Sequence, residues 1–194
     1  MVSVILITGF KPFSIFKRNP SGEIAELIDG SYFRGKEVIG RSFEMSRKAV
    51  IEEYIPELEK KYDPILNLSV SPGLNAVSLE KIAINWSEIH TDEELVPPSS
   101  GFIVNDAPDG IFSRIPLMDI LESLRSSRIP SRISYSAGAG IGNMISFYSL
   151  FLTRSKAGLI QFPVDISDAL DGKYPSMGID LMIKSVEIAI QKTI

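Results

Sequence analysis

The chain has 194 residues, a formal net charge of −4, 44% hydrophobic residues and 23% charged residues. These values are typical of one globular domain spanning 1–194, and they exclude wholesale disorder and a strongly basic nucleic-acid-binding protein. The sequence contains no cysteine, and its single histidine is His90. Disulfides, thiolate nucleophiles and metal sites built from cysteines or several histidines are therefore excluded.

The first residues are apolar and lack the basic segment of a signal peptide, so they predict a buried strand. No apolar run approaches the roughly 18 residues that a membrane-spanning helix needs. We therefore expect a cytoplasmic protein that binds neither membranes nor nucleic acid. Nothing in the sequence calls for a cofactor or a metal ion.

Strand and helix patterns alternate along the first half of the chain. They predict strands at 2–8, 37–43, 65–70 and 79–86, and helices that begin at Pro20 and Ser46. Pro56 lies inside the second helical pattern, where proline lacks a backbone donor, so we expect a kink or a change of register. The following loop, 91–110, is rich in proline, serine, aspartate and glycine, and loops of this length are often functional.

The second half continues the alternation. It predicts a helix that begins at Pro116, a strand at 132–136, a glycine-rich turn at 137–142, a helix at 143–152, a strand at 158–162 and a helix at 176–191. Five or six strands that alternate with helices predict a single-domain three-layer α/β/α sandwich. Its twisted sheet is expected to be mainly parallel or mixed.

Two places in this pattern are candidates for ligand binding. Phe10 and Phe13 directly follow the first strand, and ligands of such sheets bind beyond the carboxyl ends of strands. The alternative is that both rings pack beneath the loop. The glycine-rich turn precedes a helix, so its backbone N–H groups could hold an anion or oxyanion. The alternative there is that the glycines only permit a tight turn, and their spacing is too short for a dinucleotide-binding motif.

Glu80 is a carboxylate in an otherwise apolar strand pattern. A carboxylate in such a place is a candidate acid–base group. The alternative is a carboxylate that is simply solvated.

Five segments, in this order, together resemble a known family. They are 6–13 with 19–21, 71–73 with 80–85, 109–117, 134–143 and 157–163. The chain resembles pyroglutamyl peptidase I, also called pyrrolidone carboxyl peptidase, over nearly its whole length. This family removes an N-terminal pyroglutamyl residue with a Cys–His–Glu triad and often forms tetramers, so the resemblance implies its fold and a homo-oligomer (dimer or tetramer).

The resemblance implies that part of the family's site is kept. Phe10 and Phe13 match the aromatic pair around the pyrrolidone ring, and Asn19 matches the asparagine that fixes this pocket. Glu80 matches the acid of the triad. Ile141 and Gly142 lie at the start of the helix that follows the glycine-rich turn, so their backbone N–H groups are the candidate oxyanion site.

The same resemblance implies that the chemical groups are lost. Gly142 stands at the position of the nucleophilic cysteine, and Gln161 stands at the position of the histidine base. Leu74 and His90 stand where the family has arginines. Glycine cannot form an acyl-enzyme, and a glutamine amide does not accept a proton near neutral pH.

The nearby serines do not replace the missing nucleophile. Ser136 precedes Gly142 by six residues and Ser146 follows it by one helical turn, so neither is at the nucleophile position or has a matched base. The leading hypothesis is a degenerate family member that binds a pyroglutamyl-like or small acidic ligand, or a peptide N-terminus, without cleaving it. One alternative is a hydrolase of altered mechanism that uses Glu80 and His90. Another is a structural, oligomeric protein with a vestigial site.

Overall fold

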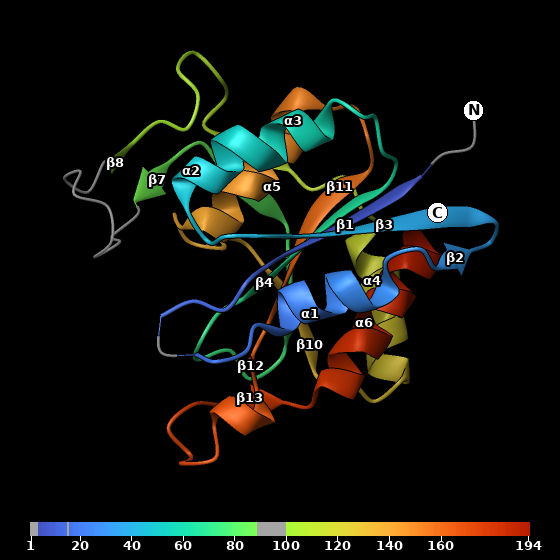
Figure 1. Cartoon of the computed structure of the whole chain (residues 1–194). Helices are drawn as coiled ribbons and strands as arrows, with labels where there is room; N and C mark the ends of the chain where they lie inside the picture. The colour runs from blue at the N-terminus through green and yellow to red at the C-terminus, as the bar shows by residue number, and fades with distance from the viewer. Residues whose placement is uncertain (1–3, 15, 89–99) are drawn as a thin grey trace.

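A computed structural model describes residues 4–14, 16–88 and 100–194, and it shows a twisted sheet between two layers of helices (Figure 1). The seven strands of the sheet run in the order β10-β5-β11-β4-β1-β3-β2. Their bounds are Ile5–Phe10 (β1), Tyr32–Phe33 (β2), Lys36–Phe43 (β3), Ile65–Val70 (β4), Val77–Glu80 (β5), Ser131–Ser134 (β10) and Ala157–Phe162 (β11). Most neighbours are parallel, but β5 and β11 pair antiparallel, as do β2 and β3. The predicted three-layer α/β fold with a mixed sheet is confirmed.

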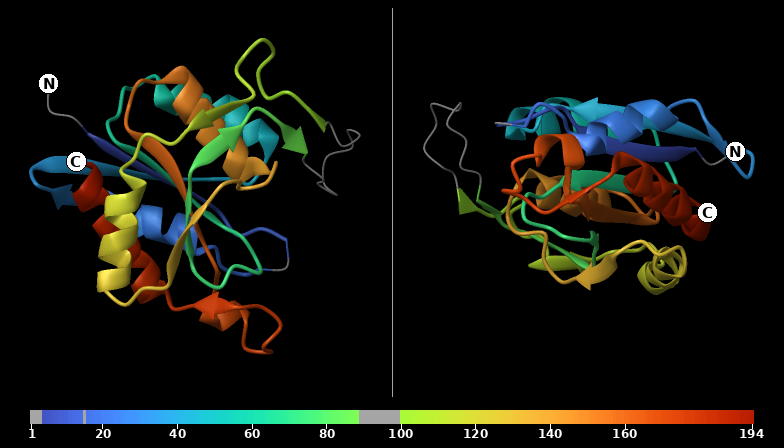
Figure 2. Two further views of the ribbon diagram at one scale, coloured as in Figure 1. Left: turned by 180° about the vertical axis from the view of Figure 1, so that it is seen from behind. Right: turned by 90° about the horizontal axis from the view of Figure 1, so that it is seen from below.

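The helices divide between the two faces of the sheet (Figure 1, Figure 2). One face carries Pro20–Ile28 (α1), Leu117–Ser126 (α4) and Ile179–Thr193 (α6). The other face carries Ile141–Leu152 (α5) and a continuous helical segment made of Arg47–Ala49 (α2), the π-helical Val50–Tyr54 (η1) and Ile55–Leu58 (α3). None of the described helices is long and apolar enough to cross a membrane.

Strands β1, β4 and β11 form the centre of the sheet and are buried along their whole length. Their side chains alternate between the two faces. In β1, Ile5 and Ile7 join the apolar cluster beneath α1 and α6, whereas Leu6 and Phe10 join the cluster beneath α5. This is why these strands read as continuous apolar runs, which are typical of strands covered on both faces.

Short paired strands lie outside the main sheet. They are Ile82–Ile84 (β6) with Gly110–Phe112 (β9), Ser87–Glu88 (β7) with Ser100–Gly101 (β8), and Val164–Asp165 (β12) with Ser176–Met177 (β13). A short helix, Ile166–Asp168 (η2), follows β12.

Several strand and helix boundaries differ from those predicted. The strand predicted at 79–86 divides at Lys81 into β5 and β6. Lys81 still donates its backbone N–H to the Ser134 carbonyl of β10 at 2.7 Å, whereas β6 beyond it pairs with β9 outside the main sheet. The last helix begins at Ile179 rather than at 176, since Ser176 and Met177 pair with β12. The change of register predicted from proline takes the form of the π-helical turn just before it.

Candidate functional site

A row of polar side chains crosses the sheet near the carboxyl ends of β4 and β11. The strand register places Ser69 opposite Gln161, and Gln161 opposite Ser78. Ser78 in turn pairs with Arg132 on the edge strand β10. Paired residues share one face of a sheet, and this face is the one that α5 covers, because Gly142 of α5 lies against Ser69.

A second polar row runs beside the first on the same face. Glu80 pairs with Ser134 on one side and with Leu159 on the other. Leu159 pairs with Asn67, and Asn67 pairs with Thr8. The two rows together place serines, a glutamine, an asparagine and a carboxylate beneath α5 and its preceding turn.

The N-terminus of α5 lies over the first polar row, because Gly142 lies against Ser69 and Gln161. Gly140 caps the helix without a side-chain hydrogen bond, and Gly138 adopts a φ of +76° in the turn before it. The first helical hydrogen bond runs from Met144 N–H to the Gly140 carbonyl, so the N–H groups ahead of it have no intrahelical acceptor. A helix terminus of this kind favours a negative or partly negative group.

Asn143 fixes the position of this helix terminus. Its Oδ1 accepts from Ile84 N–H at 2.9 Å, and its Nδ2 donates to the carbonyls of Ile84 at 2.9 Å and Trp86 at 3.2 Å. The first turn of α5 is therefore tied to β6. Ile141 is buried at the same terminus.

Positions 142 and 161 lie side by side. A Cβ built on Gly142 would lie 3.7 Å from Nε2 of Gln161 and 3.0 Å from Oγ of Ser69. Gln161 donates through Nε2 to Ser69 Oγ at 3.0 Å, and both side chains are buried. The sequence analysis did not single out Ser69, although a polar residue inside the apolar run 65–70 was a signal that could have found it.

Glu80 is a buried carboxylate without a hydrogen-bond partner. Its exposed fraction is 3%, and within the described part of the chain neither carboxylate oxygen meets a donor of hydrogen-bonding geometry. Burial raises the pKa of Glu80, and the hydroxyls of Ser134 and Ser78 and the charge of Arg132 oppose this only in part. Glu80 is diagonal to Gln161 across the β5–β11 pair, and diagonal neighbours lie about 7–8 Å apart. Glu80 is thus buried rather than solvated.

Phe10 and Phe13 belong to different apolar clusters. Phe10 has no exposed surface and packs in the cluster beneath α5. Phe13 is only partly buried and belongs to the opposite cluster, where its ring centroid lies 5.6 Å from that of Phe16. Phe16 in turn contacts Tyr174 edge-on at 5.4 Å. Phe10 therefore packs inside the fold, and a pocket shared by Phe10 and Phe13 stays a prediction.

Asn19 joins the loop after β1 to helix α1. Its Oδ1 accepts from the backbone N–H of Ser21 at 3.2 Å and from Ser21 Oγ at 2.7 Å, which makes it the N-cap of α1. Its Nδ2 donates to the Lys11 carbonyl at 3.0 Å. The side chain is buried, so its contacts are with the loop and the helix.

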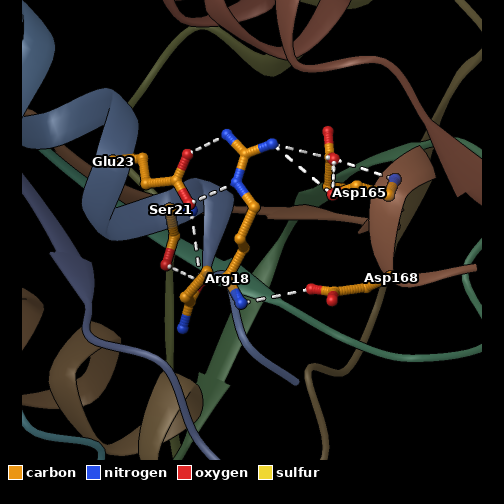
Figure 3. Close-up of polar contacts among 7 residues, drawn as sticks. Arg18, Ser21, Glu23, Asp165 and Asp168 are labelled. Carbon is orange, nitrogen blue, oxygen red and sulfur yellow. Dashed lines mark hydrogen bonds and ion pairs between the residues drawn. The ribbon is translucent and has the colours of Figure 1, made fainter.

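Arg18 holds the same loop from the other side, as Figure 3 shows. Its Nε donates to Glu23 of α1 at 2.8 Å, and its Nη1 reaches Asp165 at 3.1 Å. Its backbone N–H donates to Asp168 at 3.2 Å. This cluster ties the loop that carries Phe13 to the segment after β11, a connection that no sequence pattern predicted.

The remaining candidates lie in the turn before α5, on α5, after β4 or outside the described residues. Ser136 is exposed in the turn before α5, where its hydroxyl accepts from Gly138 N–H at 3.1 Å. Ser146 is buried on α5, and Leu74 is partly buried after β4. His90 lies outside the residues that the structure describes. Across residues 4–14, 16–88 and 100–194, no cluster of three or more acidic or histidine side chains could hold a metal ion.

Comparison with known proteins assigns the family. The sequence pattern of the family described as pyroglutamyl peptidase matches residues 3–194. The chain belongs to this family. Pyrrolidone-carboxylate peptidase of Lactobacillus acidophilus is 33% identical over 203 residues, covering 98% of each chain. That of Thermococcus litoralis is 32% identical over 202 residues, covering 96% of this chain and 91% of the relative.

Solved structures agree with the sequence comparison. Pyrrolidone carboxyl peptidase from Thermococcus litoralis matches with a TM-score of 0.92 at 31% identity, covering 98% of this chain and 93% of that chain. A mutant pyrrolidone carboxyl peptidase from Pyrococcus furiosus also matches with a TM-score of 0.92, at 29% identity and with 97% of each chain covered. The predicted family and its fold are therefore confirmed.

Proposed function

We propose that this chain is a family member that binds a pyroglutamyl-like or small acidic ligand, or a pyroglutamyl peptide N-terminus, without cleaving it. The observation that carries the proposal is the pair Gly142 and Gln161. The two positions are adjacent, with 3.7 Å between a Cβ built on Gly142 and Nε2 of Gln161. A nucleophile and a base placed there would be within working distance, but this chain has neither group.

The missing groups remove the chemical steps of acyl transfer. Without a side chain, Gly142 forms no covalent intermediate, and the Gln161 amide is a hydrogen-bond donor to Ser69 rather than a proton acceptor. In serine proteases that lose the triad, binding and the oxyanion hole leave a residual acceleration of only ~10³–10⁴ over water. Such a rate is too slow for a working peptidase.

Ligand binding is supported by polar groups that have no hydrogen-bond partner within the described chain. The first turn of α5 has no capping side chain, and Glu80 has no hydrogen-bond partner within the described chain. Asn19 and Arg18 hold the loop that carries Phe13 in place through hydrogen bonds. A ligand with a carbonyl or carboxylate and a hydrogen-bond donor would complement these groups.

Calorimetric titration tests the proposal. We expect saturable heat with pyroglutamate or a pyroglutamyl dipeptide amide and none with the matched prolyl dipeptide amide, which lacks the lactam carbonyl. Chromatography of the mixture after titration should recover the dipeptide intact. Absence of heat and of a thermal shift at millimolar ligand would contradict binding, and release of free pyroglutamate would contradict the absence of cleavage.

A second candidate is a hydrolase in which Glu80 acts as the acid–base group, with His90 assisting. The observation that favours it is the burial of Glu80, which raises its pKa toward the range useful for a general acid or base. The Glu80→Gln variant should then abolish any detected hydrolysis. If neither binding nor hydrolysis is found, a homo-oligomeric structural role remains, and light scattering would measure the assembly.

A further inference from the structure

Ser69 fills the space into which a side chain at position 142 would project. A Cβ on Gly142 would lie 3.0 Å from Ser69 Oγ and 3.4 Å from Ser69 Cβ. The first distance is tighter than most real contacts of a Cβ atom, so Ser69 Oγ would have to shift by a few tenths of an ångström, whereas the second is an ordinary van der Waals contact. The conflict therefore comes from the hydroxyl and not from the rest of Ser69.

The Ser69 hydroxyl is not free to move aside. Its oxygen accepts from Gln161 Nε2 at 3.0 Å, and Ser69 is 2% exposed in a strand with neighbours on both sides. Rotation away from Gly142 would break this hydrogen bond and leave the Gln161 amide unpaired in a buried place. The geometry couples positions 69, 142 and 161 into one unit.

We propose that Ser69 determines whether α5 can present a side chain at position 142, and that its hydroxyl takes the place of that side chain in the site. The proposal rests on the proposed function, because it explains how the site is closed to a nucleophile from α5 while it stays polar. Its consequence is specific. A ring N–H of a histidine at 161 can hold the Ser69 hydroxyl as Gln161 Nε2 does, so Gly142→Cys with Gln161→His should gain full activity only when the Ser69 hydroxyl is also removed.

A thermal double-mutant cycle tests the competition for space without any ligand. The four proteins are the parent, Ser69→Ala, Gly142→Ala, and the two changes combined. Alanine is a better helix former than glycine, so Gly142→Ala should raise Tm by about 3 °C when Ser69 is alanine. With the serine hydroxyl present, the same change should lower Tm. Equal shifts of Tm in the two backgrounds would overturn the proposal.

An activity comparison tests the consequence. Hydrolysis of a pyroglutamyl fluorogenic amide is measured for Gly142→Cys with Gln161→His, and for the same pair with Ser69→Ala added. We expect at least about a tenfold higher rate for the triple variant, since a misplaced reacting group costs on the order of 10²-fold. The matched control adds Ser136→Ala to the same pair in place of Ser69→Ala. Ser136 is exposed in the turn, so removal of its hydroxyl should not raise the rate of hydrolysis.

The outcomes separate this proposal from the proposed function. Equal and measurable rates for the double and triple variants would overturn the role of Ser69, while leaving the loss of activity at positions 142 and 161 intact. If neither variant is active, the thermal cycle alone decides the proposal. Failure of the unmodified protein to bind pyroglutamyl ligands would contradict the proposed function and leave the result of the thermal cycle unchanged.

Discussion

Asn67 and Glu80 lie on the same face of the sheet and differ in their hydrogen bonding. Asn67 accepts through Oδ1 from Thr8 and Tyr54, each at 2.8 Å, and donates through Nδ2 to Ser149 at 3.0 Å. Glu80 lies in the same row of the sheet but has no hydrogen-bond partner in the described part of the chain. Both side chains are almost completely buried.

The difference indicates a structural role for Asn67 and leaves Glu80 as a candidate for a functional one. A buried polar network whose members are all hydrogen-bonded stabilises one packing arrangement. Here the network around Asn67 fixes how η1 and α5 pack on the sheet. The Glu80 carboxylate lies near the hydroxyls of Ser78 and Ser134, but no hydrogen bond of good geometry holds it within the described chain, and such burial destabilises the fold. The comparison makes the region around Glu80, and not that around Asn67, the candidate site.

The largest expected effect is at the paired group. Asn67→Ala leaves the hydroxyls of Thr8, Tyr54 and Ser149 without their shared partner. We expect the free energy of unfolding to fall by about 3 kcal/mol, measured by urea denaturation. Asn105→Ala, at an exposed asparagine, is the control and should change stability by less than about 0.5 kcal/mol. A similar small loss for Asn67→Ala would show that the network is not structural.

An intermediate effect is expected at Asn19, which is fully paired but lies at the border of the site. Asn19→Ala removes the N-cap of α1 and the bond to the Lys11 carbonyl, so we expect a loss of about 1–2 kcal/mol in unfolding free energy. Asn19→Asp keeps the capping acceptor and loses only the donor to Lys11. It should therefore be less destabilising, and equal losses for the two variants would refute the capping role.

The smallest effect, and one of opposite sign, is expected at the unpaired group. The pKa of Glu80 is raised by burial in the folded state, so stability falls as pH rises through the folded pKa. Glu80→Gln should remove this loss and raise Tm at pH 8, while Tm at pH 4 stays nearly unchanged. Glu122→Gln, at an exposed carboxylate, should show no such difference between the two pH values. A lower Tm at pH 8 for Glu80→Gln would mean that the carboxylate has a stabilising partner.

The sequence predicted the layers of the fold but not the contacts within the site. Continuous apolar runs identified β1, β4 and β11, because strands buried on both faces leave that signature. The contact between Ser69 and Gly142 depends on how α5 sits over β4, which no local pattern encodes. Phe13 was equally unpredictable, because β1 ends at Phe10 and strand alternation then no longer determines which face a side chain joins.

The resemblance to the family indicated which positions belong to the candidate site, and the structure shows which of them are adjacent in space. Gly142 and Gln161 are adjacent in space although they lie on different elements. Glu80 stays a predicted site residue, and its burial could not be predicted from the short apolar segment around it. The cluster around Arg18 joins residues that are about 150 positions apart, and only the folded chain brings them together.

The proposed function requires that the unmodified chain does not cleave pyroglutamyl bonds. The most direct test is to incubate purified protein with a pyroglutamyl fluorogenic amide and follow fluorophore release against a protein-free blank. We expect release indistinguishable from the blank. Turnover by the unmodified protein, lost in the Glu80→Gln variant, would contradict it and would identify a hydrolase built around Glu80.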